Sequence, residues 1–387
     1  MISYMEEFFT TGKLDFNSSG SGVEWTFSAT GDYGIIPSIA DNVARNGVDP
    51  LAAKINELVK ADVSVTNLEV GLTSVDDVGG KGVRGDRELF MRMHNAAPFN
   101  VYSFANNHIR DAGADALRET FEIFKEQDIL YVGGGIDKSE AERSLFIDCK
   151  GVKLGILAFA QKENQIAGKN LPGAAELIAG KVIAAAQELV VECDVPIVIM
   201  HEGYEFMDFP RVQFMELCRK LVTLGVKLVI GHHSHVPQGI ERINDSLIFY
   251  SLGNFLFDQP SFTLYPWTRR SFVPAISFKG SEISLLELRP FEITLNPLDI
   301  RLADTDECKA MFEHLRITSE IICDEKKLHN ELEKFYTNIL LPEFFGYIRS
   351  YGNQHDNDFS ALIEQFKGQK PVHNVFADFL DVYGNLI

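Results

Sequence analysis

Basic side chains are in the minority in this chain of 387 residues, which has 36 lysines and arginines against 55 aspartates and glutamates. The formal net charge is therefore −19 at pH 7. Nucleic-acid backbones and anionic membranes repel a surface of that sign. We therefore expect neither a nucleic acid nor an anionic lipid surface as a partner.

Cysteines are few as well: there are five, scattered along the chain, with no CxxC pair. An odd number of unclustered cysteines is typical of reduced thiols. The first residues lack the basic stretch and apolar run of a secretion signal, and no window approaches the roughly 18 apolar residues of a membrane span. These absences predict a cytoplasmic protein without a membrane segment. They say nothing about its oligomeric state.

What the chain does have is a regular alternation of strand-like and helix-like segments. Apolar, β-rich runs alternate with stretches whose apolar residues recur at helical spacing. This alternation predicts βαβ units and a parallel sheet. The expected strands are 25–30, 62–67, 101–105, 153–160, 195–200, 227–231 and 247–253, and the expected helices are 49–61, 113–127, 174–193 and 211–225.

The pattern changes in the last third of the chain. From about residue 278 it predicts a few antiparallel strands with short turns, and from about 305 it predicts helices. We expect one domain over residues 22–300 and a helical extension over 301–387 that packs on it. The glycine-rich segment 132–137 contains no GxGxxG, so we interpret it as a loop, which argues against a cofactor enzyme of the Rossmann type.

Polar clusters begin within a residue or two of the ends of six expected strands. In open α/β sheets, loops and helix N-termini converge at that edge. Asp, Glu, Asn and His side chains meeting there form the mixed oxygen and nitrogen ligand set of one or two divalent metals. The clusters are Gly31-Asp32, Asn67-Leu68-Glu69, Asn106-Asn107-His108, His201-Glu202-Gly203, His232–His235 and Ser251–Asn254.

Single members of these clusters also have ordinary structural explanations. Asp32 taken alone is best explained as a helix cap. Asn67 and Asn106 have the residue type of turn positions, and His201 alone is compatible with a buried histidine that has a hydrogen-bond partner. Six such clusters in succession, each at a strand end, favour a shared site instead.

Two clusters are harder to explain by packing. Glu69 ends an apolar run, where an unpaired carboxylate would be costly to bury. Three of the chain's ten histidines lie between residues 232 and 235. If this segment is extended, His233 and His235 point the same way, because side chains two apart in a strand share a face. That arrangement predicts chelation of a metal.

The ordered series GD, NLE, ANNHxxDxG, HxGxE, GHHxH and SLGNFxFD resembles the CapA family of poly-γ-glutamate capsule biosynthesis proteins, which are related to the calcineurin-like metallophosphoesterases. The resemblance covers roughly residues 25–300. It implies an α/β fold, namely a four-layer αββα sandwich with the metal site where the strand ends meet, followed by the C-terminal helical extension.

The resemblance also implies a ligand set for one or two divalent ions (Mn, Fe, Zn or Mg), with one carboxylate shared between the two positions. The first ion would be held by Asp32, Glu69 and His235, and the second by Glu69, Asn107, His201 and His233.

Further roles follow from the same resemblance. His108 would face the substrate as proton donor or transition-state stabiliser, with Asp111 orienting its ring. His232 stands where many metallophosphoesterases have glycine, and it would contact the ligands without binding the metal itself. Asn254 would organise the loop near the ligands. The candidates for substrate binding, all close in sequence to the ligands, are Arg84, Arg110, Glu205 and Gln238.

Two departures from the wider phosphoesterase pattern bear on the reaction. The usual Asp-x-His has Gly34 in place of the histidine, and the usual bridging aspartate is the longer Glu69. The leading hypothesis is a metal-dependent hydrolase acting on an anionic small molecule or a γ-glutamyl compound. A phosphate ester and an amide remain alternatives as its substrate. A non-hydrolytic accessory protein of polymer synthesis is the competing hypothesis.

Overall fold

The computed structural model describes residues 5–17, 21–73, 83–163, 165–257 and 265–340. The chain divides into two compact units, of which the larger comprises the residues up to Gln161 and Gln165–Ser319. The smaller contains Lys162–Asn164 and the chain from Glu320 onward. The predicted domain boundary near residue 300, and the packing of the extension on the first domain, stay predictions.

The larger unit contains a nine-stranded sheet among the described residues. Its parallel part is β2-β3-β6-β7, with short β16 running parallel to β2 on its other side. Antiparallel strands β17, β18, β1 and β19 complete it. The bounds are β1 Lys13–Asp15, β2 Glu24–Tyr33, β3 Val63–Leu68, β6 Val101–Ser103, β7 Leu130–Val132, β16 Asn254–Leu256, β17 Arg270–Lys279, β18 Glu282–Thr294 and β19 Asp299–Leu302.

A six-stranded sheet in the order β14-β15-β13-β12-β10-β9 is the second layer. The strands β15, β13, β12 and β10 are parallel, and antiparallel strands close both edges. Its central strands read as unbroken apolar runs because both faces are buried. The bounds are β9 Leu145–Cys149, β10 Val152–Ala160, β12 Val195–His201, β13 Leu228–His232, β14 Ile240–Ile243 and β15 Ser246–Phe249.

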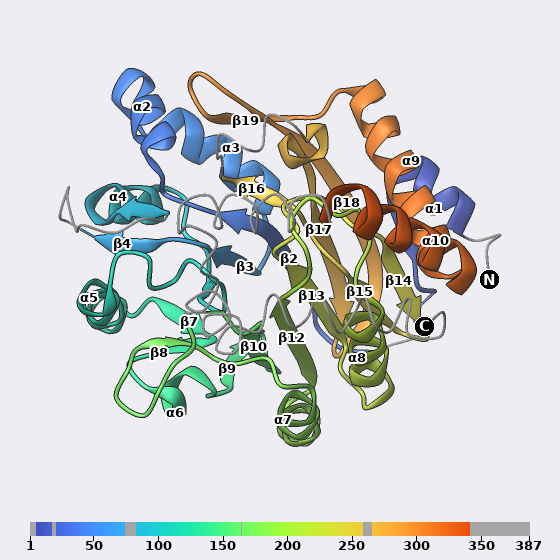
Figure 1. The fold of residues 1–387 in the computed structure, drawn as a ribbon, viewed down its shortest axis with the longest axis horizontal. Coiled ribbons are helices and arrows are strands. Elements are labelled where there is room, and N and C mark those ends of the chain that lie inside the picture. Colours follow the sequence, from blue (N-terminus) through green and yellow to red (C-terminus); the bar gives the residue numbers. More distant parts are fainter. Residues whose placement is uncertain (1–4, 18–20, 74–82, 164, 258–264, 341–387) are drawn as a thin grey trace, which may run out of the picture. The chain divides into compact units, whose positions relative to one another are not determined.

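Helices cover the sheets (Figure 1). Helix α3 contacts β2 and β17 of the first sheet, and α7 and α8 contact the central strands of the second. One hydrophobic cluster joins both sheets, so the two share a core. This arrangement confirms the predicted α/β sandwich. The helices are α1 Met5–Thr11, α2 Pro37–Asn46, α3 Asp49–Val59, α4 Arg87–Ala96, α5 Ala114–Glu126, α6 Lys138–Ala141, α7 Ala179–Glu192 and α8 Val212–Thr223.

Two segments differ from the sequence-based expectation. Gly134–Gly135, expected as a loop, forms the short strand β8 and pairs with β11 (Gly173–Ala174). The helix expected over 174–193 starts only at Ala179, because Ala174 belongs to β11 and Glu176 forms an isolated bridge with Ala160. A second short pair joins β4 (Gly71–Thr73) to β5 (Arg84–Asp86).

The antiparallel strands predicted after residue 278 are confirmed, although β17 already begins at Arg270. The predicted helices from 305 are confirmed as far as the structure describes them, by α9 (Thr305–Ile322), α10 (Glu325–Phe335) and the π-helix Tyr336–Leu340. Asp324 caps α10 by accepting a hydrogen bond from the Lys327 N–H. No helix in the described part of the chain combines the length and the apolar content that crossing a membrane requires.

Candidate metal centre

Strand register places the candidate residues in two rows, one in each sheet. In the first sheet, Asn254, Asp32 and Asn67 are neighbours across β16, β2 and β3. In the second sheet, His201 on β12 and His232 on β13 are direct partners. Except for Asn254, which begins β16, these residues lie at the carboxyl ends of their parallel strands, where sites form in such sheets.

The glycine before Asp32 makes the first row possible. A Cβ atom on Gly31 would lie 1.9 Å from the carbonyl oxygen of Gly253, so only glycine permits this approach of the two backbones. The Asp32 N–H donates to that same carbonyl at 2.9 Å. The motif Gly-Asp is thus explained by the close passage of the chain that carries Asn254.

The histidine cluster does not have the extended conformation expected from the sequence. His233 and His235 have φ angles of 91° and 57°, both in the left-handed region that side chains other than glycine seldom adopt. The chain therefore turns directly after β13. Backbone strain of about 1–3 kcal/mol at such residues is typical of functional sites. The two rings nevertheless face the same centre, with their centroids 6.4 Å apart.

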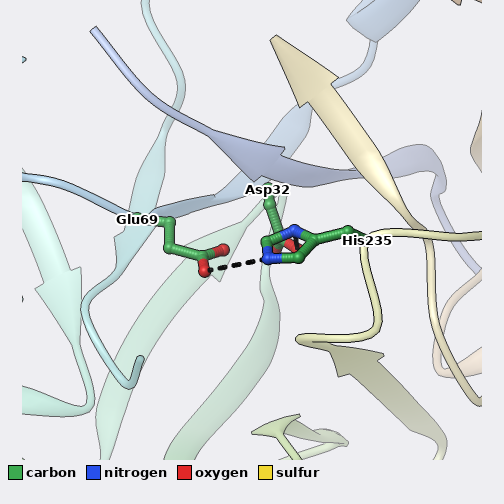
Figure 2. Close-up of side chains that lie close together, drawn as sticks. All are labelled: Asp32, Glu69 and His235. Atoms are coloured by element: carbon green, nitrogen blue, oxygen red, sulfur yellow. Dashed lines mark ion pairs between the residues drawn. The ribbon is translucent and has the colours of Figure 1, made fainter. Parts of the chain in front are cut away.

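The first predicted ligand group comes together at this centre. One ligand atom each from Asp32, Glu69 and His235 lies within 4.8 Å of the other two. Nδ1 of His235 is 3.3 Å from Oδ2 of Asp32, and its Nε2 is 3.9 Å from Oε1 of Glu69. Figure 2 shows the ring of His235 between the two carboxylates. One nitrogen of His235 and one oxygen of each carboxylate therefore form a candidate ligand set for an ion.

The second predicted group lies beside it and shares Glu69. Oε1 of Glu69 is 3.6 Å from Nε2 of His201. That nitrogen is in turn 2.9 Å from Oδ1 of Asn107 and 3.0 Å from Nδ1 of His233. The structure thus brings all six predicted ligands together, and their role as ligands stays a prediction.

The chemistry of these donors fits a divalent cation. Nε2 of His201 lies within hydrogen-bond distance of both Oδ1 of Asn107 and Nδ1 of His233. A proton between these atoms can satisfy only one of the two contacts, so the other contact brings two lone pairs together. A cation would be shared by all three. Asp32 and Glu69 bring two negative charges to side chains that are 0% exposed. Buried carboxylates of this kind need a positive partner.

The titration behaviour of the site follows from its burial and its charges. Burial alone would raise the pKa of Asp32, but hydrogen bonds from His232 and His235 hold it well below its usual value. Burial lowers the pKa of His201 well below normal, which keeps its ring neutral. Burial also acts to lower the pKa of His235, but Asp32 outweighs it and raises that pKa. The ionised Asp32 and the neutral His201 are thus in the forms that bind metals.

His108 lies at the exposed side of the centre. Its Nε2 is 4.0 Å from Oε1 of Glu69, and its side chain is 18% exposed whereas that of Glu69 is buried. Nδ1 of His108 donates to Oδ2 of Asp111 at 2.7 Å, and Asp111 also accepts from the Val83 N–H. The pair has the geometry that its predicted role requires, and no observation tests the role itself.

His232 and Asn254 each contact one of the predicted ligands. Nδ1 of His232 is 3.0 Å from Oδ1 of Asp32. Oδ1 of Asn254 accepts from Nδ1 of His235 at 2.9 Å, and its amide nitrogen donates to the Thr268 carbonyl at 3.0 Å. Their supporting roles stay predictions.

The four candidates for substrate binding have diverse surroundings. Arg110 donates to the carbonyls of Pro172 and Ile166, and the Gln238 amide donates to the Met207 carbonyl at 2.8 Å. These two side chains thus hold backbone segments. Arg84, on β5, is half-buried, and Glu205 is exposed, with a charge that helps to raise the pKa of His235. A role in substrate binding stays a prediction for all four.

Two contacts at the centre were not anticipated from the sequence. Gln161, directly after β10, lies with its amide nitrogen 2.8 Å from Nε2 of His233, and its oxygen accepts from the Gly203 N–H. Its position at a strand end was the available signal. Asn67, which has the residue type of a turn position, instead donates to Oδ1 of Asp32 at 2.8 Å and to Oε2 of Glu69 at 3.1 Å.

The structure also accounts for Gly34, which stands where a ligand histidine was expected. A Cβ atom at this position would lie 2.5 Å from Cδ2 of Phe257. That buried ring stacks on His235, with ring centroids 5.4 Å apart. The ring of Phe257 therefore occupies the space that a side chain at residue 34 would need.

Residues 26–259 match the family described as "Bacterial capsule synthesis protein PGA_cap". The capsule biosynthesis protein CapA of Bacillus anthracis is 30% identical over 215 residues, which cover 54% of this chain and 51% of that protein. The PGA biosynthesis protein CapA of Bacillus subtilis is 31% identical over 198 residues, 50% and 51% of the two chains. A probable polyglutamine synthesis accessory protein of Mycobacterium tuberculosis is 28% identical over 232 residues, 54% and 58%. The chain thus spans about half the length of the curated relatives it matches.

Solved structures give weaker likenesses. A phosphatase from Mycoplasma pneumoniae aligns with a TM-score of 0.45 and 15% identity over 74% of this chain and 97% of that chain. A 5′-nucleotidase precursor from Thermus thermophilus aligns with a TM-score of 0.45 and 14% identity over 78% and 60%. Likenesses at this level say nothing about activity.

Proposed function

The chain belongs to the bacterial capsule synthesis protein family PGA_cap, and from this premise we propose that it is a metal-dependent hydrolase of an anionic substrate. One observation carries the proposal: Nε2 of the partly exposed His108 lies 4.0 Å from the carboxylate that both predicted ligand groups share. A purely structural metal site has no use for a histidine oriented by a carboxylate at its open side.

Six side chains would hold the metal: Asp32, Glu69 and His235 at one position, and Asn107, His201 and His233, with Glu69, at the other. A bound divalent ion supplies Lewis-acid polarisation of a substrate oxygen and stabilises the negative charge that develops on it. A phosphoryl group and an amide carbonyl are both suited to this chemistry. Phosphorylated metabolites and γ-glutamyl compounds are therefore the two substrate classes to compare.

The chain's own residues would handle the proton. Asp111 accepts from Nδ1 of His108, which fixes the ring so that its Nε2 points toward the centre. His108 would hold a proton at Nε2 and pass it to the leaving group. Full burial of Glu69 and His201 keeps bulk water from the inner face of the site. Among the described residues of the centre, His108 marks the side from which substrate would enter.

The test is hydrolysis of p-nitrophenyl phosphate and of γ-glutamyl-p-nitroanilide in the presence of Mn²⁺. We expect turnover of one of the two, with His108→Ala lowering kcat by roughly 10²- to 10⁴-fold. His329→Ala, at an exposed histidine of α10, serves as the control and should keep the wild-type rate. Equal rates in wild type and His108→Ala would remove His108 from the mechanism. No turnover of either substrate by the Mn²⁺-loaded wild type would contradict the proposal.

A non-hydrolytic accessory role is the second candidate, and the surroundings of Gly34 favour it. The ring of Phe257 leaves no room for a ligand side chain at residue 34, so the first metal position lacks a donor from there. A relative carries the name of an accessory protein of polymer synthesis. Calorimetric binding of poly-γ-glutamate, without cleavage in the presence of Mn²⁺, would support this role against hydrolysis.

A further inference from the structure

The side-chain amide of Asn67 contacts three of the buried predicted ligands in the metal centre. Its side-chain nitrogen is 2.8 Å from Oδ1 of Asp32, 3.1 Å from Oε2 of Glu69 and 3.3 Å from Nδ1 of His201. All four residues are fully buried, and they come from β2, from β3 and the residue after it, and from β12. One amide therefore links three predicted ligands that lie far apart in the sequence.

In each of the two carboxylates, only one oxygen accepts a hydrogen bond from this amide. In Asp32, Oδ1 faces Asn67 and His232, whereas Oδ2 faces Nδ1 of His235 at 3.3 Å. In Glu69, Oε2 accepts from Asn67, whereas Oε1 faces the rings of His201, His235 and His108 at 3.6, 3.9 and 4.0 Å. Each carboxylate thus has one oxygen that accepts from the amide and one that does not, although in Asp32 the oxygen bonded to the amide also faces His232.

The orientation of this amide is itself fixed. Oδ1 of Asn67 accepts from the Asn106 amide at 3.2 Å, which determines the side from which Asn67 donates. The Asn106 nitrogen also donates to the Leu68 carbonyl, and its oxygen accepts from the His108 N–H at 3.1 Å. The two asparagines therefore connect the carboxylates to the loop that carries His108.

We propose that Asn67 is a positioning residue that selects which oxygen of Asp32 and of Glu69 is presented to the metal, with Asn106 locking its amide. The inference rests on the proposed metal site but not on hydrolysis. A carboxylate that has lost this donor can rotate and bind through either oxygen or both. Partners of this kind change metal affinity by about 10- to 100-fold when they are removed.

Metal binding without substrate tests the proposal. Asn67→Ser should raise the Mn²⁺ dissociation constant, measured by calorimetry, by at least about tenfold. It should also shift the visible absorption bands of the Co²⁺-loaded protein, which report ligand geometry. Asn100→Ala is the matched control: Asn100 accepts from the Ser64 N–H and hydroxyl at the opposite end of the same strand. The control should bind Mn²⁺ and absorb as wild type does, even if it lowers the melting temperature.

Wild-type affinity and an unchanged Co²⁺ spectrum in Asn67→Ser would overturn the proposal. If Asn67→Ser does not fold, Asn106→Ser is measured instead. This variant removes the hydrogen bond to the side-chain oxygen of Asn67 but leaves the side-chain nitrogen of Asn67, which donates to the carboxylates, in place. An intermediate spectral shift in Asn106→Ser supports the proposal, and an unchanged spectrum contradicts it. A wild type that binds neither ion would overturn both the metal site and this role. Binding with the expected changes but without hydrolysis would contradict the enzyme proposal alone.

Discussion

At the scale of single residues, the pair of His108 and Asp111 decides between a catalytic and a structural metal centre. Asp111 holds Nδ1 of His108 at 2.7 Å, and this contact orients the ring toward Glu69. The spacing His-x-x-Asp was sufficient to predict the pair, because residues three apart in a tight turn lie side by side. The role of Asn67 was not predictable in the same way, since it depends on the register between β2 and β3.

Asp111→Asn should lower kcat by roughly 10- to 100-fold, because an amide orients the ring less strongly and stabilises its protonated form less. Steady-state rates of the Mn²⁺-loaded protein measure this effect. Asp115→Asn is the control, since Asp115 is exposed and pairs with Arg118 on the surface of α5. A loss of activity that is equal in the two variants would show that His108 does not depend on Asp111.

Gly34→Ala should destabilise the fold, because its Cβ atom would overlap the ring of Phe257. Overpacking of this kind costs about 1–3 kcal/mol in the free energy of unfolding. Adding Phe257→Leu should recover part of this loss, so that the double variant is more stable than the sum of the single effects predicts. Urea unfolding of the four proteins measures the coupling. Strictly additive effects would show that the two positions do not interact.

At the scale of elements, the ends of the strands were the most predictable feature of the molecule. Long apolar runs such as that of β12 identified the central strands. The polar clusters that follow these runs in the sequence identified the edge of the sheets where the site lies. Helices α2 and α4 were not predicted, because each has only ten residues and its apolar pattern is correspondingly short. The turn at His233 and His235 was not predicted either, since nothing in the residue types indicates positive φ angles.

Helix α9 contacts the neighbourhood of the site through His314. Its Nε2 donates to the Pro237 carbonyl at 2.8 Å, and its ring stacks on Trp267 at 3.9 Å between centroids. Burial lowers the pKa of His314, and it does the same for His94 and His201. These rings are therefore neutral in the folded protein at pH values where the unfolded chain already binds protons.

The metal-free protein should accordingly lose stability as the pH falls below about 6.5, the usual pKa of histidine. The unfolded chain takes up protons first, so the free energy of unfolding decreases until the folded state is protonated as well. His314→Gln keeps the donor and removes one titrating ring, so it should reduce this slope by up to about 1.4 kcal/mol per pH unit. Urea unfolding between pH 7 and 5 measures both slopes. Identical slopes would mean that His314 does not contribute.

At the scale of the whole molecule, the centre joins the two sheets of the sandwich. Asp32, Glu69 and Asn107 come from the first sheet and its loops, whereas His201, His233 and His235 come from the second. A metal ion held by both groups would link the two sheets. Periodicity predicted the alternating strands and helices, and the family resemblance implied the sandwich, but neither predicted the contacts that the amide side chains make at the centre.

Removal of metal should therefore lower the melting temperature of the whole protein. An ion at a hundred times its dissociation constant adds about 2.7 kcal/mol to the free energy of unfolding. Differential scanning calorimetry with EDTA and with saturating Mn²⁺ measures the difference. His235→Ala should show a much smaller response to Mn²⁺ than wild type. An equal response in both would mean that the ion binds elsewhere.

Anomalous X-ray diffraction from Mn²⁺-soaked crystals tests the central claim most directly. The account predicts one or two anomalous peaks between Asp32, Glu69, Asn107, His201, His233 and His235, with Glu69 Oε1 about 2.0–2.2 Å from each ion. Crystals that show no peak in this cage at saturating Mn²⁺, or a peak bound only by other residues, would contradict it.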